Sequence, residues 1–309
     1  MSSRLIRRAA FSVLSLLCVS LLVFLLLAAA PGDAATLVRE ETGAAGGSDS
    51  VRAEFGLTGS VWSQYLAFVG RVVAHGDFGR SFFSNRPVTA EIADRLPYTV
   101  LLAVLGMALA LLLGIACGTI AALHRGSWVD ITLMSLSMVG LSVPQFWLAL
   151  LLILVFALWL GWVPVNGAGD WRNLILPVTC LGVPSAAVYA RLVRANVLDT
   201  LHADYVLVAR AKGLPPRLVV VRHVLRNSLI PTVTVAGLHF GHLLGGTVVI
   251  ETIFGWPGVG RLAVEAIFRR DRPVIVGTAL CLAVAYVAIN FLVDVLYSVL
   301  DPRVGQSAV

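Results

Sequence analysis

The chain has 309 residues, of which 58% are hydrophobic and only 13% charged, and its mean hydropathy is +0.89. Soluble domains carry about 25% charged residues, so this composition excludes an ordinary soluble domain and indicates an integral membrane protein. The net charge of +6 does not indicate nucleic-acid binding, because the basic residues flank apolar runs, where membrane orientation accounts for them.

Six apolar runs predict an all-α integral membrane protein with six transmembrane helices, since a spanning helix needs about 20 residues. The first run exceeds the roughly 7–15 apolar residues of a signal peptide, so we predict a retained anchor and not a cleaved signal. The fourth run has the weakest span signal, because it is short and contains Pro177 and Pro184, which break or kink helices. The runs are 9–30, 99–123, 131–160, 174–190, 229–250 and 274–300.

The distribution of Arg and Lys predicts the orientation in the membrane. Residues 31–96 form an outer loop that is too long for the positive-inside rule to apply. Among the other loops and tails, those on the side of the N-terminus carry 12 Arg and Lys residues and those on the opposite side carry 5. We therefore predict that both termini are cytoplasmic.

The outer segment 31–96 divides into two parts. Residues 34–53 are rich in Ala, Gly and Ser, which is typical of a flexible segment. Across 54–76, apolar side chains recur at helical spacing and predict an amphipathic helix. Two interpretations of this helix stay open, packing onto the transmembrane bundle or receiving a binding protein. The residues that define it are Trp62, Tyr65, Leu66, Val69 and Val73.

The loop between the fourth and fifth runs is basic and holds Lys212, the only lysine of the chain. We predict a short helix over 203–216 that docks onto a cytoplasmic partner. Gly213 suits a helix stop, and Pro215-Pro216 bar further helix. In the alternative interpretation, the basic residues only set the topology. The predicted contact residues are Leu207, Ala209, Arg210, Ala211, Lys212, Gly213 and Leu214.

Polar side chains lie inside the last two apolar runs. An ionisable group in a membrane span is costly and normally faces protein or water. These groups therefore either join helices by hydrogen bonds or line a translocation path, and both interpretations stay open. A metal site is not predicted, since His239 and His242 have no evident third ligand beside them. The candidate path residues are His239, His242, Thr247, Asn290 and Asp294.

The turn at 255–260 contains Trp256, Pro257 and Gly258. Irregular backbone near the membrane is tolerated inside protein or at a water-filled cavity, so these three are candidate residues of an extracytoplasmic gate. A plain surface turn is the alternative.

Catalytic motifs are absent from the sequence, and we predict no catalytic residue. The single lysine does not stand in the pattern G-x-x-x-x-G-K-[ST], which excludes a phosphate-binding P-loop. An ATPase that drives transport would therefore be another polypeptide.

Taken in order and spacing, several motifs resemble the dipeptide/oligopeptide/nickel family of ABC-transporter permeases, in the branch of the first permease subunit (DppB/OppB-like). The resemblance covers most of the chain except 34–60. The coupling motif of ABC permeases in general is matched only in part around Gly213, and its proline comes later, at Pro231. The matching stretches include Pro31-Gly-Asp33, His75-Gly-Asp-Phe-Gly-Arg-Ser81, Arg86-Pro-Val88, Arg95-Leu-Pro97, Ala209-Arg-Ala-Lys-Gly213, Glu251-Thr-Ile-Phe-Gly-Trp-Pro-Gly-Val-Gly260, Arg270-Asp271 and Asp301-Pro-Arg303.

The resemblance implies a type I ABC importer permease in the bacterial cytoplasmic membrane, which works by alternating access. The implied partners are a second permease subunit, two cytoplasmic ATPase domains, an extracytoplasmic substrate-binding protein and membrane lipid, and no nucleic acid. ATP and Mg would be bound by the ATPase subunits, and this chain would hold no cofactor. The implied parts are an anchor helix 1–30, an extracytoplasmic segment 31–96, a permease core 97–303 with the coupling loop 196–228, and a tail 304–309.

The implied substrate is a di- or oligopeptide. Nickel, a metal chelate or another small solute is the alternative within the same family, and it is less favoured because the candidate path residues and the loops are not rich in metal ligands. A membrane enzyme or a sensor without transport activity is the alternative from a different functional class.

Overall fold

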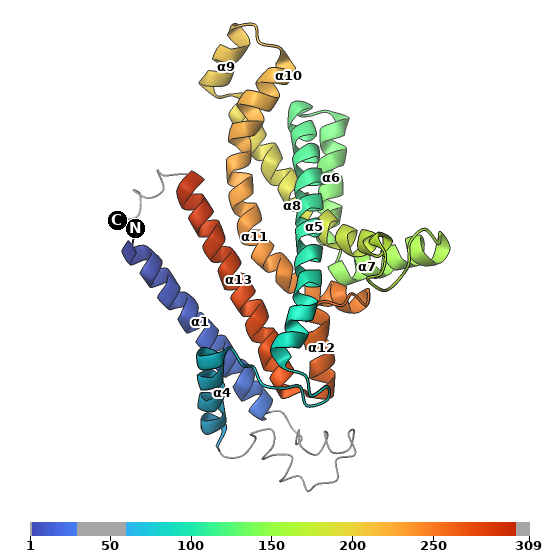
Figure 1. Cartoon of the computed structure of the whole chain (residues 1–309). Coiled ribbons are helices and arrows are strands. Elements are labelled where there is room, and N and C mark those ends of the chain that lie inside the picture. The colour runs from blue at the N-terminus through green and yellow to red at the C-terminus, as the bar shows by residue number, and fades with distance from the viewer. Residues whose placement is uncertain (1, 30–59, 301–309) are drawn as a thin grey trace. The chain divides into compact units, whose positions relative to one another are not determined.

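The computed structural model of the chain describes residues 2–29 and 60–300, with the side chains of 10–27, 29 and 60–293. The regular structure of these residues is helical, apart from one isolated antiparallel bridge between Arg80 and Pro87. They form two compact units, whose helices are labelled in Figure 1. The first unit comprises residues up to Thr99 together with Pro257–Val287, and the second comprises Val100–Trp256 together with the residues from Ala288 onward.

Among the described residues, five helices are long and apolar enough to cross a membrane, and a bent pair of helices provides a sixth candidate. The predicted count of six spans is therefore confirmed when the bent pair counts as one. The five are α1 (Ser2–Ala29), α5 (Val88–Leu123), η2 with α8 (Trp171–Leu174 and Ile175–Leu201), α10 with η3 and α11 (Pro216–Leu218, Val219–Leu225 and Arg226–Ile253), and α13 (Arg272–Leu300).

The third apolar run is bent, which its apolar composition did not indicate. It consists of α6 (Trp128–Ser142) and α7 (Gln145–Leu152), which is extended by the π-helix η1 (Ile153–Trp159), and the two parts make an angle of 103°. The break falls at Val143, which has an extended backbone with ψ 121°. A residue that precedes a proline avoids the helical conformation, and Pro144 follows Val143.

The fourth run is more regular than its prolines suggest, because α8 is continuous from Ile175 to Leu201. Pro177 lies in the first turn, where a backbone N–H has no acceptor within the helix. Pro184 lies inside α8 and removes one hydrogen bond, a loss that neighbouring helices compensate in membrane proteins. The fourth run is therefore a continuous helix long enough to span a membrane, despite its prolines.

In the first unit, α4 (Val61–His75) is bounded by residues that favour helix ends. The side chain of Ser60 accepts a backbone N–H of the first turn, and Gly76 ends the helix with φ 64°. These are the usual signals of a helix start and a helix stop. The amphipathic helix predicted across 54–76 is confirmed over 61–75, and residues 54–59 lie outside the described part of the chain.

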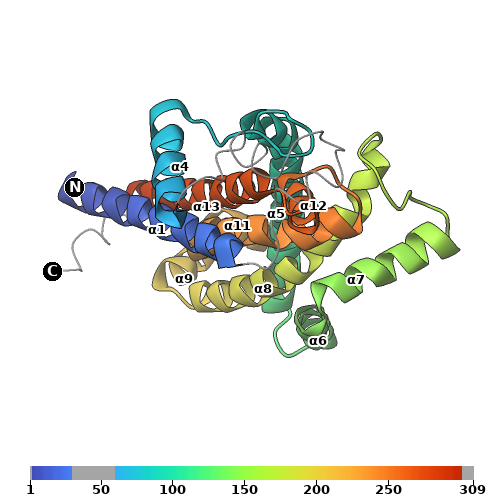
Figure 2. The ribbon, with the colours of Figure 1, turned by 90° about the horizontal axis from the view of Figure 1, so that it is seen from below.

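The helix α4 packs against α1, as Figure 2 shows from below. Tyr65 and Phe68 are the buried residues of α4. The ring of Phe24 on α1 meets the ring of Tyr65 edge to face at 5.5 Å. In addition, the hydroxyls of Tyr65 and Ser20 are 2.9 Å apart and share a buried hydrogen bond. The interpretation in which this helix packs onto the bundle therefore holds for its buried side.

In the second unit, α8 packs against α6, α7 and α11. It also lies very close to α5. A Cβ at Gly114 would lie 2.5 Å from Cβ of Tyr189, and a Cβ at Gly118 would lie 2.5 Å from the carbonyl oxygen of Ala190. Small residues at helix interfaces permit this approach in membrane proteins, so the two glycines allow α5 and α8 to pack backbone to backbone.

Candidate functional site

The basic segment, residues 203–218, connects α8 to η3 and contains α9 (Asp204–Ala211) and α10. The helix α9 is shorter than the predicted 203–216, because the backbone turns at Gly213 with φ 75°. Glycine adopts this left-handed conformation without steric cost. Pro216 is then the first residue of α10, a position where proline is tolerated. The predicted helix stop at Gly213 is confirmed.

One hydrophobic cluster holds the basic segment on the second unit. Ala209, a predicted partner contact, is 6% exposed and belongs to this cluster, and Leu214 packs against it. Ala209 therefore attaches the segment to its own chain, and Leu214 contacts the same cluster while it stays partly exposed. The cluster also contains Val193 and Val197 of α8, Val206 of α9, and Val219 and Val224 of η3.

The opposite side of α9 is an exposed apolar surface. The side chains of Leu207 and Val208 are each 52% exposed. Arg210, Ala211 and Lys212 are exposed beside them, so cations border the apolar surface. We did not predict Val208 as a contact residue from the sequence, although the spacing of its buried neighbours at 206 and 209 would place it outward on a helix.

At the other end of α9, Tyr205 is tied to α11. The side-chain amide of Asn227 donates to the Tyr205 hydroxyl over 3.1 Å, and it also donates to the backbone carbonyl of His223. This contact fixes the start of α9 near the first turn of α11, so the basic segment is joined to both helices that enter and leave it.

A polar row crosses the second unit from Tyr189 to His242. The rings of His239 and His242 are stacked with centroids 5.8 Å apart, as their spacing of three residues on one helix predicts. The fully buried Tyr189 has its hydroxyl 3.0 Å from Nδ1 of His239. His242 is exposed, so the row leads from the core of the unit to its surface. Tyr189 was not among the candidate residues, because its helix partner cannot be identified from sequence.

The other candidate path residues lie at further positions of α11 and α13. Thr247 is fully buried, and its hydroxyl donates to the carbonyl of Leu244 over 2.8 Å. Asn290 is half-buried on α13, and Asp294 lies on α13 with a side chain outside the described ones. Within the described residues, no group of three His, Cys, Asp or Glu could hold a metal ion.

The turn after α11 is buried. The side chain of Trp256 is 2% exposed, and its backbone N–H donates to the carbonyl of Glu251 over 2.8 Å. Gly258 is also buried, Pro257 is half-buried, and Gly258 caps the start of α12 (Val259–Arg269). The interpretation as a plain surface turn is therefore wrong.

A buried carboxylate organises the first unit near the start of α13. The hydroxyl of Ser81 donates to Asp271 over 2.6 Å, and the backbone N–H of Phe82 donates to the other carboxylate oxygen over 3.3 Å. Burial raises the pKa of Asp271, and the bonds from Ser81 and Phe82 oppose this increase. The sequence places these residues 190 positions apart, so it carried no signal of the contact.

Comparison with known proteins decides the family. Residues 114–306 match the family described as binding-protein-dependent transport system inner membrane component. Residues 1–103 match its N-terminal part, described as binding-prot-dependent transport system membrane comp, N-term. The chain belongs to this permease family. It is a permease subunit of an ABC importer and an integral, multi-pass protein of the inner membrane, so the predicted resemblance is confirmed.

Relatives of this permease match over nearly their whole length. The glutathione transport system permease protein GsiC of Escherichia coli (strain K12) is 42% identical over 304 residues, which are 98% of this chain and 99% of the relative. GsiC of Shigella dysenteriae serotype 1 (strain Sd197) has the same identity and coverage.

Solved structures share the fold of this permease. A chain of the methionine ABC transporter MetNI in an inward-facing conformation has a TM-score of 0.58 at 19% identity, with 69% of this chain and 97% of that chain covered. A chain of an amino acid ABC transporter with histidines has a TM-score of 0.55 at 16% identity, with 68% and 94% covered. The predicted all-α, type I importer fold is confirmed.

Proposed function

We propose that this permease carries small peptides across the bacterial cytoplasmic membrane by alternating access, with both termini in the cytoplasm. The identity of 42% to permeases of glutathione transport systems over almost the entire chain supports a peptide substrate, because glutathione is itself a short peptide. The excess of Arg and Lys in the loops on the N-terminal side supports the orientation.

The partners that we propose are a second permease subunit, two cytoplasmic ATPase domains that bind ATP and Mg, and an extracytoplasmic substrate-binding protein. The exposed apolar surface of α9 carries the proposal for the ATPase. Leu207 and Val208 would enter an apolar cleft, where burial is worth about 1.5–3 kcal/mol for each large side chain. Arg210 and Lys212 would meet acidic groups at the edge of that cleft.

The path for the substrate, in this proposal, lies beside the polar row of Tyr189, His239 and His242 and beside Asn290 and Asp294 of α13. Trp256, Pro257 and Gly258 would then form a gate on the extracytoplasmic side. Ionisable groups inside membrane spans mark substrate paths when they are not used for structure. The exposed ring of His242 supports this role more strongly than the buried hydroxyl of Thr247 does.

The ATPase contact is tested by Val208→Asp in the assembled transporter. A buried, unpaired carboxylate in an apolar cleft is costly, so the ATPase subunits should no longer co-purify with the permease. Val73→Asp is the matched control, because Val73 is an exposed valine of the first unit. Retention of the ATPase by Val208→Asp would contradict the proposed docking surface.

Transport and orientation need separate measurements. Proteoliposomes with all subunits should take up radiolabelled glutathione in the presence of ATP, and uptake of free nickel without uptake of glutathione would contradict the peptide proposal. Cysteines introduced at Val73 and Lys212, in a variant without the natural cysteines, should react with impermeant reagents from opposite sides. Reaction from the same side would contradict the orientation.

A further inference from the structure

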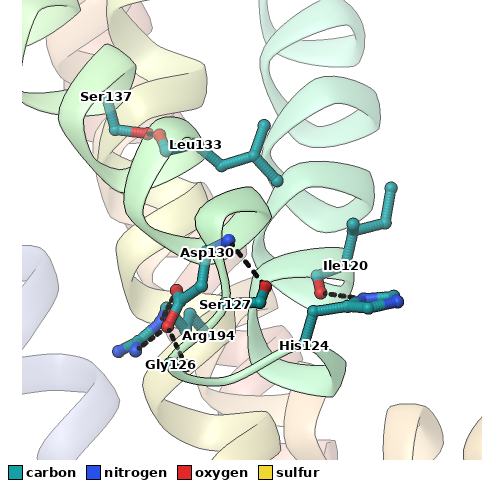
Figure 3. A network of polar contacts seen from close by, with 8 residues as sticks. All are labelled: Ile120, His124, Gly126, Ser127, Asp130, Leu133, Ser137 and Arg194. Carbon is teal, nitrogen blue, oxygen red and sulfur yellow. Dashed lines mark hydrogen bonds and ion pairs between the residues drawn. The ribbon is translucent and has the colours of Figure 1, made fainter.

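An ion pair joins the first turn of α6 to α8 (Figure 3). Nε of Arg194 lies 2.6 Å from Oδ1 of Asp130, and Nη2 of Arg194 lies 2.7 Å from Oδ2. The side chain of Asp130 is 6% exposed and that of Arg194 is 28% exposed. A guanidinium that meets a carboxylate at two points fixes both distance and direction. This pair is therefore more restrictive than an ordinary surface ion pair.

The carboxylate of Asp130 also shapes the turn between α5 and α6. The backbone N–H of Gly126 donates to Oδ2 over 3.0 Å, and the N–H of Asp130 donates to the Ser127 hydroxyl over 3.4 Å. Gly126 adopts a left-handed conformation with φ 76°. One carboxylate thus holds the start of α6, the turn before it and the side of α8 at a single point (Figure 3).

The same turn of α8 supports the basic segment. Val193 and Val197, on either side of Arg194 along the chain, are fully buried in the cluster that holds Val206 and Ala209 of α9. The helix α5 meets this turn as well, since a Cβ at Gly118 would lie 2.8 Å from Cβ of Val193. The helices α5, α6 and α9 therefore converge on one turn of α8.

The helix α6 leads from this turn to the bend of 103° between Ser142 and Gln145. It packs against α8, and the ion pair between Asp130 and Arg194 is a charged contact between the two helices. We propose that Asp130 and Arg194 are positioning residues for transport, which hold α6 to the turn beneath α9 so that a movement of the basic segment reaches α6 and its bend. This inference rests on the proposed role of α9 as the ATPase contact.

The pair is not needed to explain the stability of the fold. A buried ion pair can often be replaced by neutral residues of similar size at little cost, whereas removal of one partner leaves an uncompensated charge and costs much more. The double variant Asp130→Asn/Arg194→Gln therefore removes the directional contact and leaves no charge unpaired. In a purely structural role, this variant would recover what each single variant loses.

The experiment uses the complete transporter in proteoliposomes and measures uptake and ATP hydrolysis together. We expect the double variant to assemble and to hydrolyse ATP, while uptake per ATP hydrolysed falls about tenfold, the effect of one lost charge-assisted contact in the moving state. Arg194→Lys, which keeps the charge but not the two-point geometry, should assemble normally and lose uptake per ATP to a smaller extent.

The matched control is Arg86→Gln/Asp94→Asn, which removes an exposed ion pair of 2.8 Å in the first unit and should leave uptake per ATP unchanged. Normal uptake per ATP in the double variant and in Arg194→Lys would overturn the inference. Failure of both variants to assemble would also overturn it, because the pair would then serve the fold. A wild-type transporter whose ATP hydrolysis does not respond to substrate would instead refute the proposed function on which the inference depends.

Discussion

The short amphipathic helices α4 and α9 are attached to their units by different kinds of side chain. On α4 the buried residues are the aromatic Tyr65 and Phe68, and on α9 they are the smaller Val206 and Ala209. A buried aromatic side chain removes about 150–250 Å² from solvent, far more than alanine or valine does. The first helix is therefore firmly anchored, whereas the second is held lightly beside an exposed apolar surface.

This difference suits the packing of α4 on α1 and the proposed role of α9 as the ATPase contact. A helix that supports α1 gains from rigid aromatic packing, and a helix with the proposed role of α9 would gain from weaker attachment. Four predictions would break or sharpen the comparison, and they are arranged from the largest expected effect to the smallest.

Phe68→Ala should lower the free energy that holds α4 on the first unit by about 3–5 kcal/mol, the usual loss for a buried phenylalanine. Phe68 is 6% exposed and its ring lies 6.3 Å from Phe24 of α1. Limited proteolysis of the purified permease should then cut within α4 far faster than in the wild type. Leu66→Ala is the control, since Leu66 is 67% exposed, and equal cleavage of the two variants would contradict aromatic anchoring.

Gly213→Leu should reduce substrate-stimulated ATP hydrolysis and uptake without preventing insertion. A Cβ at Gly213 would meet no atom within 4 Å, so the penalty comes from the left-handed backbone, at about 1–2 kcal/mol. That strain would unwind the end of α9 and displace its exposed surface. Gly213→Asn is the matched control, because asparagine tolerates this conformation. Full coupling in Gly213→Leu would exclude the basic segment as the coupling element.

Tyr65→Phe should lower the stability of the first unit by about 0.5–1.5 kcal/mol, the value of one hydrogen bond. The effect stays small because the hydroxyl of Ser20 still donates to the carbonyl of Leu17 over 2.9 Å, so no buried polar group loses its partner. Thermal unfolding of the permease in nanodiscs measures the change. A loss as large as that of Phe68→Ala would show that the hydroxyl, and not the ring, anchors α4.

The stability of the first unit should increase slightly as the pH falls, because burial raises the pKa of Asp271. A carboxyl with a raised pKa in the folded state stabilises the fold below its unfolded pKa of about 3.9 and loses this contribution as the pH rises through the folded pKa. Unfolding temperatures measured from pH 4 to pH 7 should show the trend in the wild type. Asp271→Asn should show less of it, and identical pH profiles would contradict the assignment.

The sequence by itself determined the features that depend on short-range chemistry. The membrane spans follow from long apolar runs, α4 follows from helical spacing, and the end of α9 follows from Gly213 and the two prolines after it. Backbone sterics and local hydrogen bonds act over a few residues, so these features could be predicted without a fold. The family resemblance was likewise carried by motifs that stand in order along the chain.

Only the tertiary structure decided which side of each element is used. The burial of Ala209 depends on valines of α8 and η3, and the burial of Trp256 excluded the alternative of a plain surface turn. Asp130 and Arg194 lie 64 residues apart, so no local pattern could pair them. Burial and ion pairing are set by helices that meet in space, and their free energies depend on solvent exclusion that a single segment cannot provide.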